Sequence, residues 1–254
     1  MIEGKSGRGL SAGGHYFALR ENITDNSLRL LPDEARHAIK VLRLGIGDEI
    51  AAVDGEGGWY RVRIDSVDRD GLVATILERM QDVGEPAGEL TVAIGLLKQQ
   101  TRFETFLEKA VEFGVTRVVP TITERGQSGS LNMKRCRRIL IAGLKQSLRS
   151  KLPRLTEPKA FNTVLLEDAD VRLIAHEDAS REDSVLKHAD ALRDARSCHV
   201  LIGPEGGFAD SEIDRAQKAG WTMVSLGDAR LRTETAGMAA ASVIQMLKST
   251  RERL

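Results

Sequence analysis

Two segments near the C-terminus combine glycine with charged side chains. Residues 203–208 (GPEGGF) follow the apolar run at 200–202, and residues 227–236 contain Arg232 and Glu234. Glycine lets a backbone approach a ligand closely, a guanidinium can bind an anionic oxygen group at two points, and a carboxylate can accept a proton. The two segments therefore indicate a site that holds a ligand through its backbone and does electrostatic or acid–base chemistry on it.

Each segment also has a purely structural interpretation. The glycines of 203–207 can serve the turn itself, and Arg232 and Glu234 can pair with each other at the surface. A third loop begins at His176, after the apolar residues 171–175, and by default exposes a solvated histidine. The loops alone leave both interpretations open.

The elements that precede the loops indicate where the loops lie in the fold. From residue 87 onward, apolar runs alternate with segments of helical periodicity. We expect strands at 90–96, 117–122, 171–175, 199–202 and 223–226, and helices at 103–113, 131–148, 183–194, 211–219 and 234–248. Such alternation predicts an α/β domain with a mostly parallel sheet covered by helices on both faces. In such sheets ligands bind beyond the carboxyl ends of the strands, where all three loops begin.

The first 86 residues are rich in β-structure signals. Strands are expected at 15–19, 49–53, 59–67 and 72–77, with one helix near 32–43. The turn-forming residues 84–88 (GEPAG) predict a linker, so the predicted domains are 1–86 and 87–254. Residues 1–14, which include several glycines and serines, are expected to form a flexible tail.

Charge is balanced over the whole chain and concentrated locally. The 254 residues include 37 basic and 37 acidic side chains, but residues 125–159 contain ten basic side chains and one acid. This block can contact the phosphates of a nucleic acid, and it can equally be a solvated helix face.

Several other classes of protein lose support. Cys136 and Cys198 are the only cysteines and lack metal-ligand spacing, so we expect no disulfide framework and no metal site, which fits a reduced cytoplasm. No apolar stretch is long enough to span a membrane, and no secretory signal is recognisable. The phosphate-loop, dinucleotide-binding and nucleophile-elbow motifs are absent, which disfavours nucleotide-dependent enzymes and hydrolases of those types.

Taken in order, the motifs resemble those of the SPOUT methyltransferases, and most closely the RsmE type, which methylates N3 of a uridine in 16S ribosomal RNA. The resemblance rests on residues 201–207 (LIGPEGG) and 226–236 (LGDARLRTETA), preceded by 37–43 (HAIKVLR), 108–115 (EKAVEFGV) and 120–125 (PTITER). It spans nearly the whole chain. The resemblance implies a small PUA-like β-barrel, followed by a SPOUT domain whose C-terminal part is threaded as a trefoil knot, a rare topology.

The resemblance also implies the ligands. The cofactor would be S-adenosylmethionine, held where the three loops meet. The enzyme would be a cytoplasmic homodimer that acts on 16S rRNA or the small ribosomal subunit, with no membrane and no metal. The implied cofactor-binding residues are His176, Leu201, Gly203, Pro204, Gly206, Gly207, Leu226, Gly227, Leu231, Thr235 and Ala236.

Catalytic roles follow from the chemistry of such a reaction. A uracil that loses its N3 proton carries negative charge on its carbonyl oxygens, which Arg232 would bind at two points. Glu205 or Glu234 would accept the proton or orient an arginine. RNA contacts are expected from Arg125, which is also a second candidate for the role of Arg232, and from the basic residues Arg149, Lys145 and Arg43.

The chain departs from the family pattern at residues 145–149. Where the family commonly has a helix end close to E-Q-x-G-R, this chain reads KQSLR and lacks both the acid and the glycine. The cofactor loops are unaffected, so the change bears on the RNA target. Two alternatives stay open: a catalytically inactive knotted protein used in ribosome assembly, and a SPOUT methyltransferase that acts on another RNA site.

Overall fold

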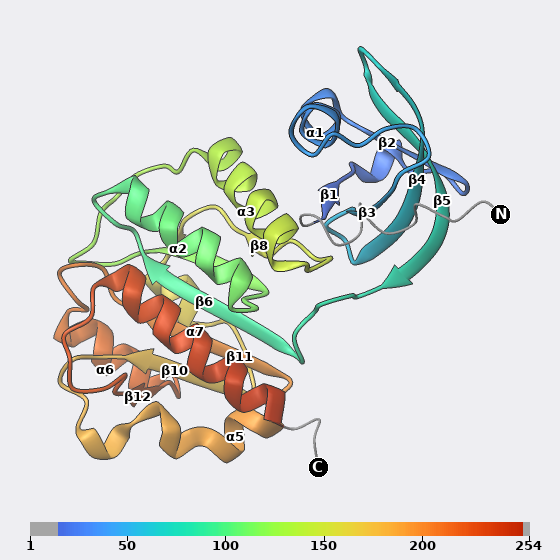
Figure 1. Ribbon diagram of the computed structural model, residues 1–254. Coiled ribbons are helices and arrows are strands. Elements are labelled where there is room, and N and C mark those ends of the chain that lie inside the picture. The colour runs from blue at the N-terminus through green and yellow to red at the C-terminus, as the bar shows by residue number, and fades with distance from the viewer. Residues whose placement is uncertain (1–14, 251–254) are drawn as a thin grey trace. The chain divides into compact units, whose positions relative to one another are not determined.

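Two separate sheets organise the chain, one in each of two units (Figure 1). The computed structural model describes residues 15–250, apart from the side chain of Arg181. The predicted N-terminal tail at 1–14 lies outside the described residues. The first unit comprises the described residues up to Glu85 together with Ile141–Leu152, and the second unit comprises the rest. The structure thus groups residues 141–152 with the first unit, whereas the predicted boundary assigns them to the second.

The first unit is built on a five-stranded sheet with the order β1-β3-β4-β5-β2. Its strands are β1 (Tyr16–Phe17), β2 (Ser27–Leu30), β3 (Glu49–Val53), β4 (Gly58–Asp68) and β5 (Gly71–Gln81). All pairs are antiparallel except β1 with β3. Alternate residues of β4, namely Tyr60, Val62 and Ile64, are buried in the core, as the period of a half-buried strand requires. Closure of this sheet into a barrel stays a prediction.

One helical segment accompanies this sheet. After the short 3-10 turn Arg20–Asn22, helix α1 (Pro32–Arg36) begins with proline and continues as a π-helical turn, His37–Val41. Ala35 and Ala38 are its core contacts. The segment ends at Arg43, which has a positive φ of 57°.

The second unit contains a seven-stranded sheet in which every pair is parallel. The order is β12-β10-β11-β6-β7-β8, and β9 also pairs with β7. The strands are β6 (Glu89–Gly95), β7 (Arg117–Ile122), β8 (Arg154–Leu155), β9 (Lys159–Ala160), β10 (Val171–Ala175), β11 (Ser197–Ile202) and β12 (Thr222–Val224). The predicted α/β fold with a parallel sheet is confirmed.

Helices cover both faces of this sheet. The helices after residue 86 are α2 (Gln100–Glu112), α3 (Met133–Ser147), α4 (Phe161–Leu165), α5 (Ala189–Asp194), α6 (Asp210–Lys218) and α7 (Thr233–Ser249), and the part of α3 from Ile141 onward belongs to the first unit. Ala93 of β6 belongs to the core cluster that includes Phe161 of α4 and Ala216 of α6. Its neighbour Ile94 faces the other way, toward α7, because successive strand residues point to opposite faces. Helix α7 runs beside α2 on the face toward which Ile94 points (Figure 1).

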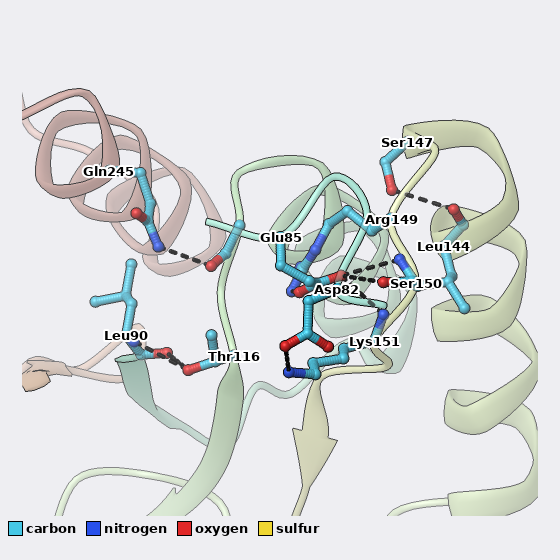
Figure 2. Close-up of polar contacts among 11 residues, drawn as sticks. Asp82, Glu85, Leu90, Thr116, Leu144, Ser147, Arg149, Ser150, Lys151 and Gln245 are labelled. Atoms are coloured by element: carbon cyan, nitrogen blue, oxygen red, sulfur yellow. Dashed lines mark hydrogen bonds and ion pairs between the residues drawn. The ribbon is translucent and has the colours of Figure 1, made fainter. Parts of the chain in front are cut away.

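Helix α7 is fixed at several points. Gly237 lets it approach α2, because a Cβ at this position would lie 2.7 Å from the ring of Phe106. Farther along, the amide of Gln245 donates to the backbone oxygen of Gly114 at 2.7 Å (Figure 2). The buried ammonium of Lys248 donates to the carbonyl of Ala195 at 3.1 Å. These contacts fix α7 near both of its ends.

The helix expected over 183–194 is interrupted. The structure has two 3-10 turns, Arg181–Asp183 and Val185–His188, and only then α5. The reason is that Ser225 pairs with this segment: its N–H donates to Asp183 O at 2.9 Å, and its carbonyl accepts from Val185 N at 3.1 Å. Those backbone groups are therefore not available for a helix. The predicted trefoil knot stays a prediction.

Candidate cofactor pocket and active site

Three loops of the second unit converge on one cavity of about 450 Å³. They follow β10, β11 and β12, which are neighbours in the sheet and run parallel, so their carboxyl ends lie at the same edge. The loop after β7 and the first turn of α2 complete the wall. The cavity is lined by Arg102, Arg125, Ala175, His176, Glu177, Asp178, Ile202, Gly203, Pro204, Glu205, Gly207, Phe208, Asp210, Leu226, Gly227, Ala229, Arg230, Leu231, Arg232, Thr233 and Ala236.

The loop after β11 is a tight turn packed against its neighbours. Gly207 has a φ of 68° and donates its N–H to Pro204 O at 2.9 Å. A Cβ at Gly206 would lie 3.0 Å from the backbone oxygen of Arg125, so this glycine faces the loop after β7 and does not line the cavity. Glycine thus serves both the turn and its close packing.

The loop after β12 brings α7 to the cavity. Gly227 has a φ of 116°, and its N–H donates to Ser225 Oγ at 3.2 Å. Arg232 has extended backbone angles immediately before α7 and makes no side-chain cap. Arg232 lines the cavity, and its guanidinium has no hydrogen bond or ion pair with another described residue. An arginine without a partner at a cavity wall is placed to bind a ligand.

The loop after β10 supplies His176. Its backbone N–H donates to Val224 O at 3.1 Å, which ties this loop to β12. Its Nδ1 accepts a hydrogen bond from Asp178 N at 3.2 Å, which orients the ring within the loop. The side chain is largely buried and forms part of the cavity wall.

Most of the predicted cofactor-binding residues therefore meet at one place. The cavity wall includes His176, Gly203, Pro204, Gly207, Leu226, Gly227, Leu231 and Ala236. It does not include Leu201, which is fully buried inside β11, nor Gly206 or Thr235.

The two predicted carboxylates have different surroundings. Glu205 is exposed at the cavity, and its Oε1 accepts a hydrogen bond from Lys98 N at 3.1 Å. Glu234 is only 7% exposed and lies outside the cavity lining. Its Oε1 is 3.8 Å from Arg102 Nε, and its Oε2 is buried without a hydrogen-bond partner among the described residues. Of these two glutamates, Glu205 is therefore the one whose carboxylate is accessible from the cavity.

The four predicted RNA-binding residues are divided between the two units. Arg125 lines the cavity, donates to Phe208 O at 3.0 Å and lies 3.6 Å from Asp210. The other three belong to the first unit. Arg43 is exposed there, whereas Lys145 forms an ion pair of 2.6 Å with Glu34.

Arg149 takes part in an ion pair inside the first unit. Its side chain is almost fully buried and forms an ion pair of 2.8 Å with Glu85 (Figure 2). The same carboxylate accepts hydrogen bonds from Ser150 N at 2.9 Å and Lys151 N at 2.8 Å. Glu85 thus fixes the chain after α3, and the guanidinium of Arg149 is engaged inside the unit instead of facing an RNA phosphate.

Sequence reasoning missed Arg102. It lies in the first turn of α2, and it lines the cavity because β6, which precedes α2, is the neighbour of β11 in the sheet. The sequence does contain a signal for it: Arg102 comes shortly after the strand expected at 90–96, and ligands bind beyond the carboxyl ends of parallel strands.

The described residues form neither a metal-binding cluster nor a membrane-spanning helix. Among the described side chains, no group of three or more His, Cys, Asp or Glu is arranged to hold a metal ion. No helix within the described part of the chain has the length and apolar character to cross a bilayer.

Comparison with known proteins identifies relatives of the whole chain. The RNA methyltransferase PUA domain matches residues 30–77. Ribosomal RNA small subunit methyltransferase E of Rickettsia conorii is 27% identical over 239 residues, which cover 93% of this chain and 97% of the relative. The crystal structure of a probable rRNA-methyltransferase from Porphyromonas gingivalis is 34% identical, with a TM-score of 0.83, over 93% of this chain and 99% of that chain.

A second solved structure carries a ligand. Ribosomal RNA small subunit methyltransferase E from Neisseria gonorrhoeae, bound to S-adenosyl methionine, is 26% identical with a TM-score of 0.79, over 92% of this chain and 98% of that chain. These likenesses confirm the predicted SPOUT-type fold. The RNA methyltransferase domain model matches residues 84–245, well over half of the chain, and the protein therefore belongs to the RNA methyltransferase family.

Proposed function

We propose that the protein transfers a methyl group from S-adenosylmethionine to N3 of a uridine in 16S ribosomal RNA. The observation that carries this proposal is the convergence of three neighbouring strand-end loops on one cavity lined by Arg232, whose guanidinium has no partner among residues 15–250. The relative from Neisseria gonorrhoeae holds S-adenosyl methionine in its crystal structure and is named for the small ribosomal subunit.

The residues present fit that cofactor. A cavity of about 450 Å³ lies within the range of small-molecule sites, roughly 300–1,000 Å³. Gly207 and Gly227 leave open space beside their backbone, where a side chain would otherwise intrude. Leu226, Leu231 and Ala236 offer apolar surface. When bound, S-adenosylmethionine supplies a methyl group that its positively charged sulfur has already activated.

Arg232 would align and stabilise the uracil. As N3 loses its proton, negative charge spreads onto the two carbonyl oxygens of the ring, and a guanidinium is a strong donor to such oxygens. Arg232 needs to break no contact with a described residue to do this. Positioning N3 close to the methyl group supplies much of the remaining acceleration.

Glu205 is the better placed of the two carboxylates to accept the N3 proton. It is exposed at the cavity and one oxygen, Oε1, is occupied by Lys98 N–H, so Oε2 can accept a proton. Glu234 is buried, and its role in this proposal is to orient an arginine.

The RNA must present an unstacked base to the cavity. Arg125 and Arg230 line the cavity and carry charges that can contact phosphates. The exposed Arg43 of the first unit would add a further phosphate contact. We also propose a cytoplasmic homodimer, which light scattering would detect as a particle of twice 27.8 kDa.

Two measurements test the proposed function. In a strain that lacks the gene, the N3-methyluridine of 16S rRNA should disappear on nucleoside mass spectrometry, and the wild-type gene should restore it. An unchanged N3-methyluridine signal would rule out the uridine assignment. Calorimetry should detect S-adenosylmethionine binding, and no binding at millimolar ligand would favour a catalytically inactive scaffold.

A further inference from the structure

We propose that Arg102 binds an anionic oxygen group of a ligand in the cavity and that Glu234 positions Arg102 for this role. The inference rests on the proposed function and deepens it, because it adds a binding residue and a positioning residue to the same site. The shared chemistry of the ligand is an oxyanion: either the carboxylate of the cofactor's methionine part or an anionic oxygen of the RNA.

The first observation is the incomplete coordination of Arg102. Its side chain is 29% exposed and lines the cavity. Its one contact with a described acidic residue is the 3.8 Å approach of Nε to Glu234 Oε1, which is too long for a hydrogen bond. A guanidinium carries five N–H donors, so the terminal nitrogens of Arg102 can bind an oxyanion at two points.

The second observation is the buried carboxylate beside it. Glu234 is 7% exposed, and its Oε2 is buried with no hydrogen-bond partner among the described residues. A buried carboxylate is costly unless a cation or hydrogen-bond donors compensate it. The guanidinium of Arg102 is the compensating cation that the structure places next to Glu234. Glu234 therefore restricts where that guanidinium can lie.

The third observation is the position of the pair in the fold. Arg102 is in the first turn of α2, and Glu234 is in the first turn of α7, two residues after Arg232. The lining of the cavity also includes Thr233, which separates Arg232 from Glu234. Among the arginines that line the cavity, Arg232 thus has no side-chain partner within the described part of the chain, whereas Arg102 lies beside the buried carboxylate of Glu234.

The cofactor arm of the test uses two ligands that differ in the amino-acid part. S-adenosylhomocysteine carries on its sulfur a chain that ends in an ammonium and a carboxylate, and 5′-methylthioadenosine has only a methyl group there. If Arg102 binds that carboxylate, Arg102→Ala should weaken S-adenosylhomocysteine binding by about tenfold or more in calorimetry and leave 5′-methylthioadenosine binding unchanged. Arg102→Lys should recover part of the loss, since it keeps the charge but not the two-point geometry.

The RNA arm uses steady-state kinetics with small ribosomal subunits from the deletion strain. If Arg102 instead binds an anionic oxygen of the RNA, Arg102→Ala should raise the KM for the subunit about tenfold or more, with S-adenosylhomocysteine affinity unchanged. The control is Arg193→Ala, an arginine of α5 that pairs with Asp190 on the helix surface and does not line the cavity. It should behave as wild type in both arms.

Glu234 is tested through Arg102. Glu234→Gln keeps the size of the side chain and removes its charge, and we expect it to weaken the same ligand that Arg102→Ala weakens. In an Arg102→Ala background it should have no further effect, because a positioning residue acts only through its partner. Thermal unfolding of each variant shows whether weaker binding comes from a loss of folded protein. If Glu234→Gln weakens the binding of both nucleoside ligands to a similar extent, the role of Glu234 is merely structural.

The outcomes separate the two levels of the proposal. If wild-type protein binds S-adenosylhomocysteine but Arg102→Ala changes neither cofactor affinity nor the KM for the subunit, the inference about Arg102 is wrong and the proposed function stands. If Glu234→Gln acts equally with and without Arg102, the positioning role is wrong. Failure of the wild-type protein to bind either nucleoside ligand would instead overturn the proposed function.

Discussion

At the scale of single residues, the arginines of the cavity differ in what already holds them. Arg125 donates to Phe208 O, and Arg230 lies 3.4 Å from Glu177, whereas Arg102 has a buried carboxylate behind it. Arg232 has none of these contacts. A side chain that is already engaged must give up or share its bonds to serve a ligand. The difference therefore supports the proposal that Arg232 acts directly on the reacting base.

Replacement of Arg232 by alanine should reduce kcat about 10² to 10³-fold, the range seen when one donor to a developing oxyanion is removed. Cofactor affinity should change little, because the proposed partner of the Arg232 guanidinium is the uracil and not the cofactor. The helix should persist, since Arg232 makes no side-chain cap to α7. Single-turnover kinetics and calorimetry measure the two effects. A variant that keeps wild-type kcat removes Arg232 from the mechanism.

A second residue-scale prediction concerns Glu85 and Arg149. Glu85→Ala should destabilise the first unit by about 3 kcal/mol, because it leaves a buried guanidinium without its carboxylate and removes the acceptor for two backbone N–H groups. Urea unfolding followed by the fluorescence of Trp59 reports this unit. The matched control is Asp82→Ala, which breaks a half-exposed pair with Lys151 and should cost less than about 1 kcal/mol. Equal losses in both variants would contradict the burial argument.

These residues also show how far a sequence can predict a site. Glycines and charged residues next to predicted strand ends can be found in the sequence, which is how Arg232 and His176 were identified. The importance of Arg102 depends on which strands are neighbours in the sheet, and a list of elements does not contain that order. The interpretation of Arg149 as an RNA contact failed to anticipate its partner, because Glu85 lies 64 residues away in the chain.

At the scale of elements, the end of α3 carries the departure from the family pattern. Leu148 directly follows the helix, is half exposed and has a φ of 60°, a conformation that costs a residue with a Cβ roughly 1–2 kcal/mol. The family's glycine occurs at this position, where helices commonly end in a left-handed residue. Leu148 thus adopts the left-handed conformation that glycine favours, although it carries a Cβ.

Leu148→Gly should therefore stabilise the first unit, by up to about 1 kcal/mol after the entropic cost of glycine in the unfolded chain is subtracted. Ser147→Gly is the matched control, because it places the same residue one position earlier, inside α3, where glycine should destabilise by roughly 0.5 kcal/mol. The midpoints of urea unfolding compare the two variants. Destabilisation by both substitutions would show that Leu148 packs usefully and is not strained.

The elements themselves were predictable where one physical signal dominates. Apolar strands such as β3, β7 and β10 match their expected bounds because the run of apolar residues and the flanking turns agree. Strand β2 was missed because its four residues, Ser27–Leu30, are too few to show a period. The helix expected over 183–194 failed for a different reason: its backbone pairs with Ser225, a contact between residues that are distant in sequence.

At the scale of the whole molecule, each unit contains one tryptophan and, beside it, one histidine, which is partly buried in the first unit and buried in the second. Trp59 donates its indole N–H to His15 Nε2 at 3.0 Å in the first unit, and the rings of Trp221 and His199 are 6.4 Å apart in the second. Burial lowers the pKa of both histidines from the ordinary value of 6.5. Each histidine therefore makes the stability of its own unit depend on pH. The fluorescence of the neighbouring tryptophan can report the unfolding of that unit.

The low pKa of His199 determines how the stability of the second unit changes with pH. Below pH 6.5 the unfolded chain protonates this histidine while the folded unit, whose His199 pKa is lower, does not. Protons then favour unfolding, so the second unit should lose stability as the pH falls from 6.5 to the folded pKa of His199, by at most about 1.4 kcal/mol per pH unit. Glu167 acts in a separate window below pH 4.5: burial raises its pKa, but hydrogen bonds from Arg117 and Lys159 outweigh burial and lower it overall.

The measurement is urea unfolding of a Trp59→Phe variant, in which Trp221 alone reports, between pH 7.5 and 5. The free energy of unfolding should decline below pH 6.5, and His199→Gln in the same background should flatten that decline because no proton is taken up at this position on unfolding. The His15→Gln variant is the matched control, since its histidine belongs to the other unit and should leave the slope seen by Trp221 unchanged. A decline of equal steepness with and without His199 would place the acid sensitivity of the second unit in another group, and the burial of His199 would then not be the cause.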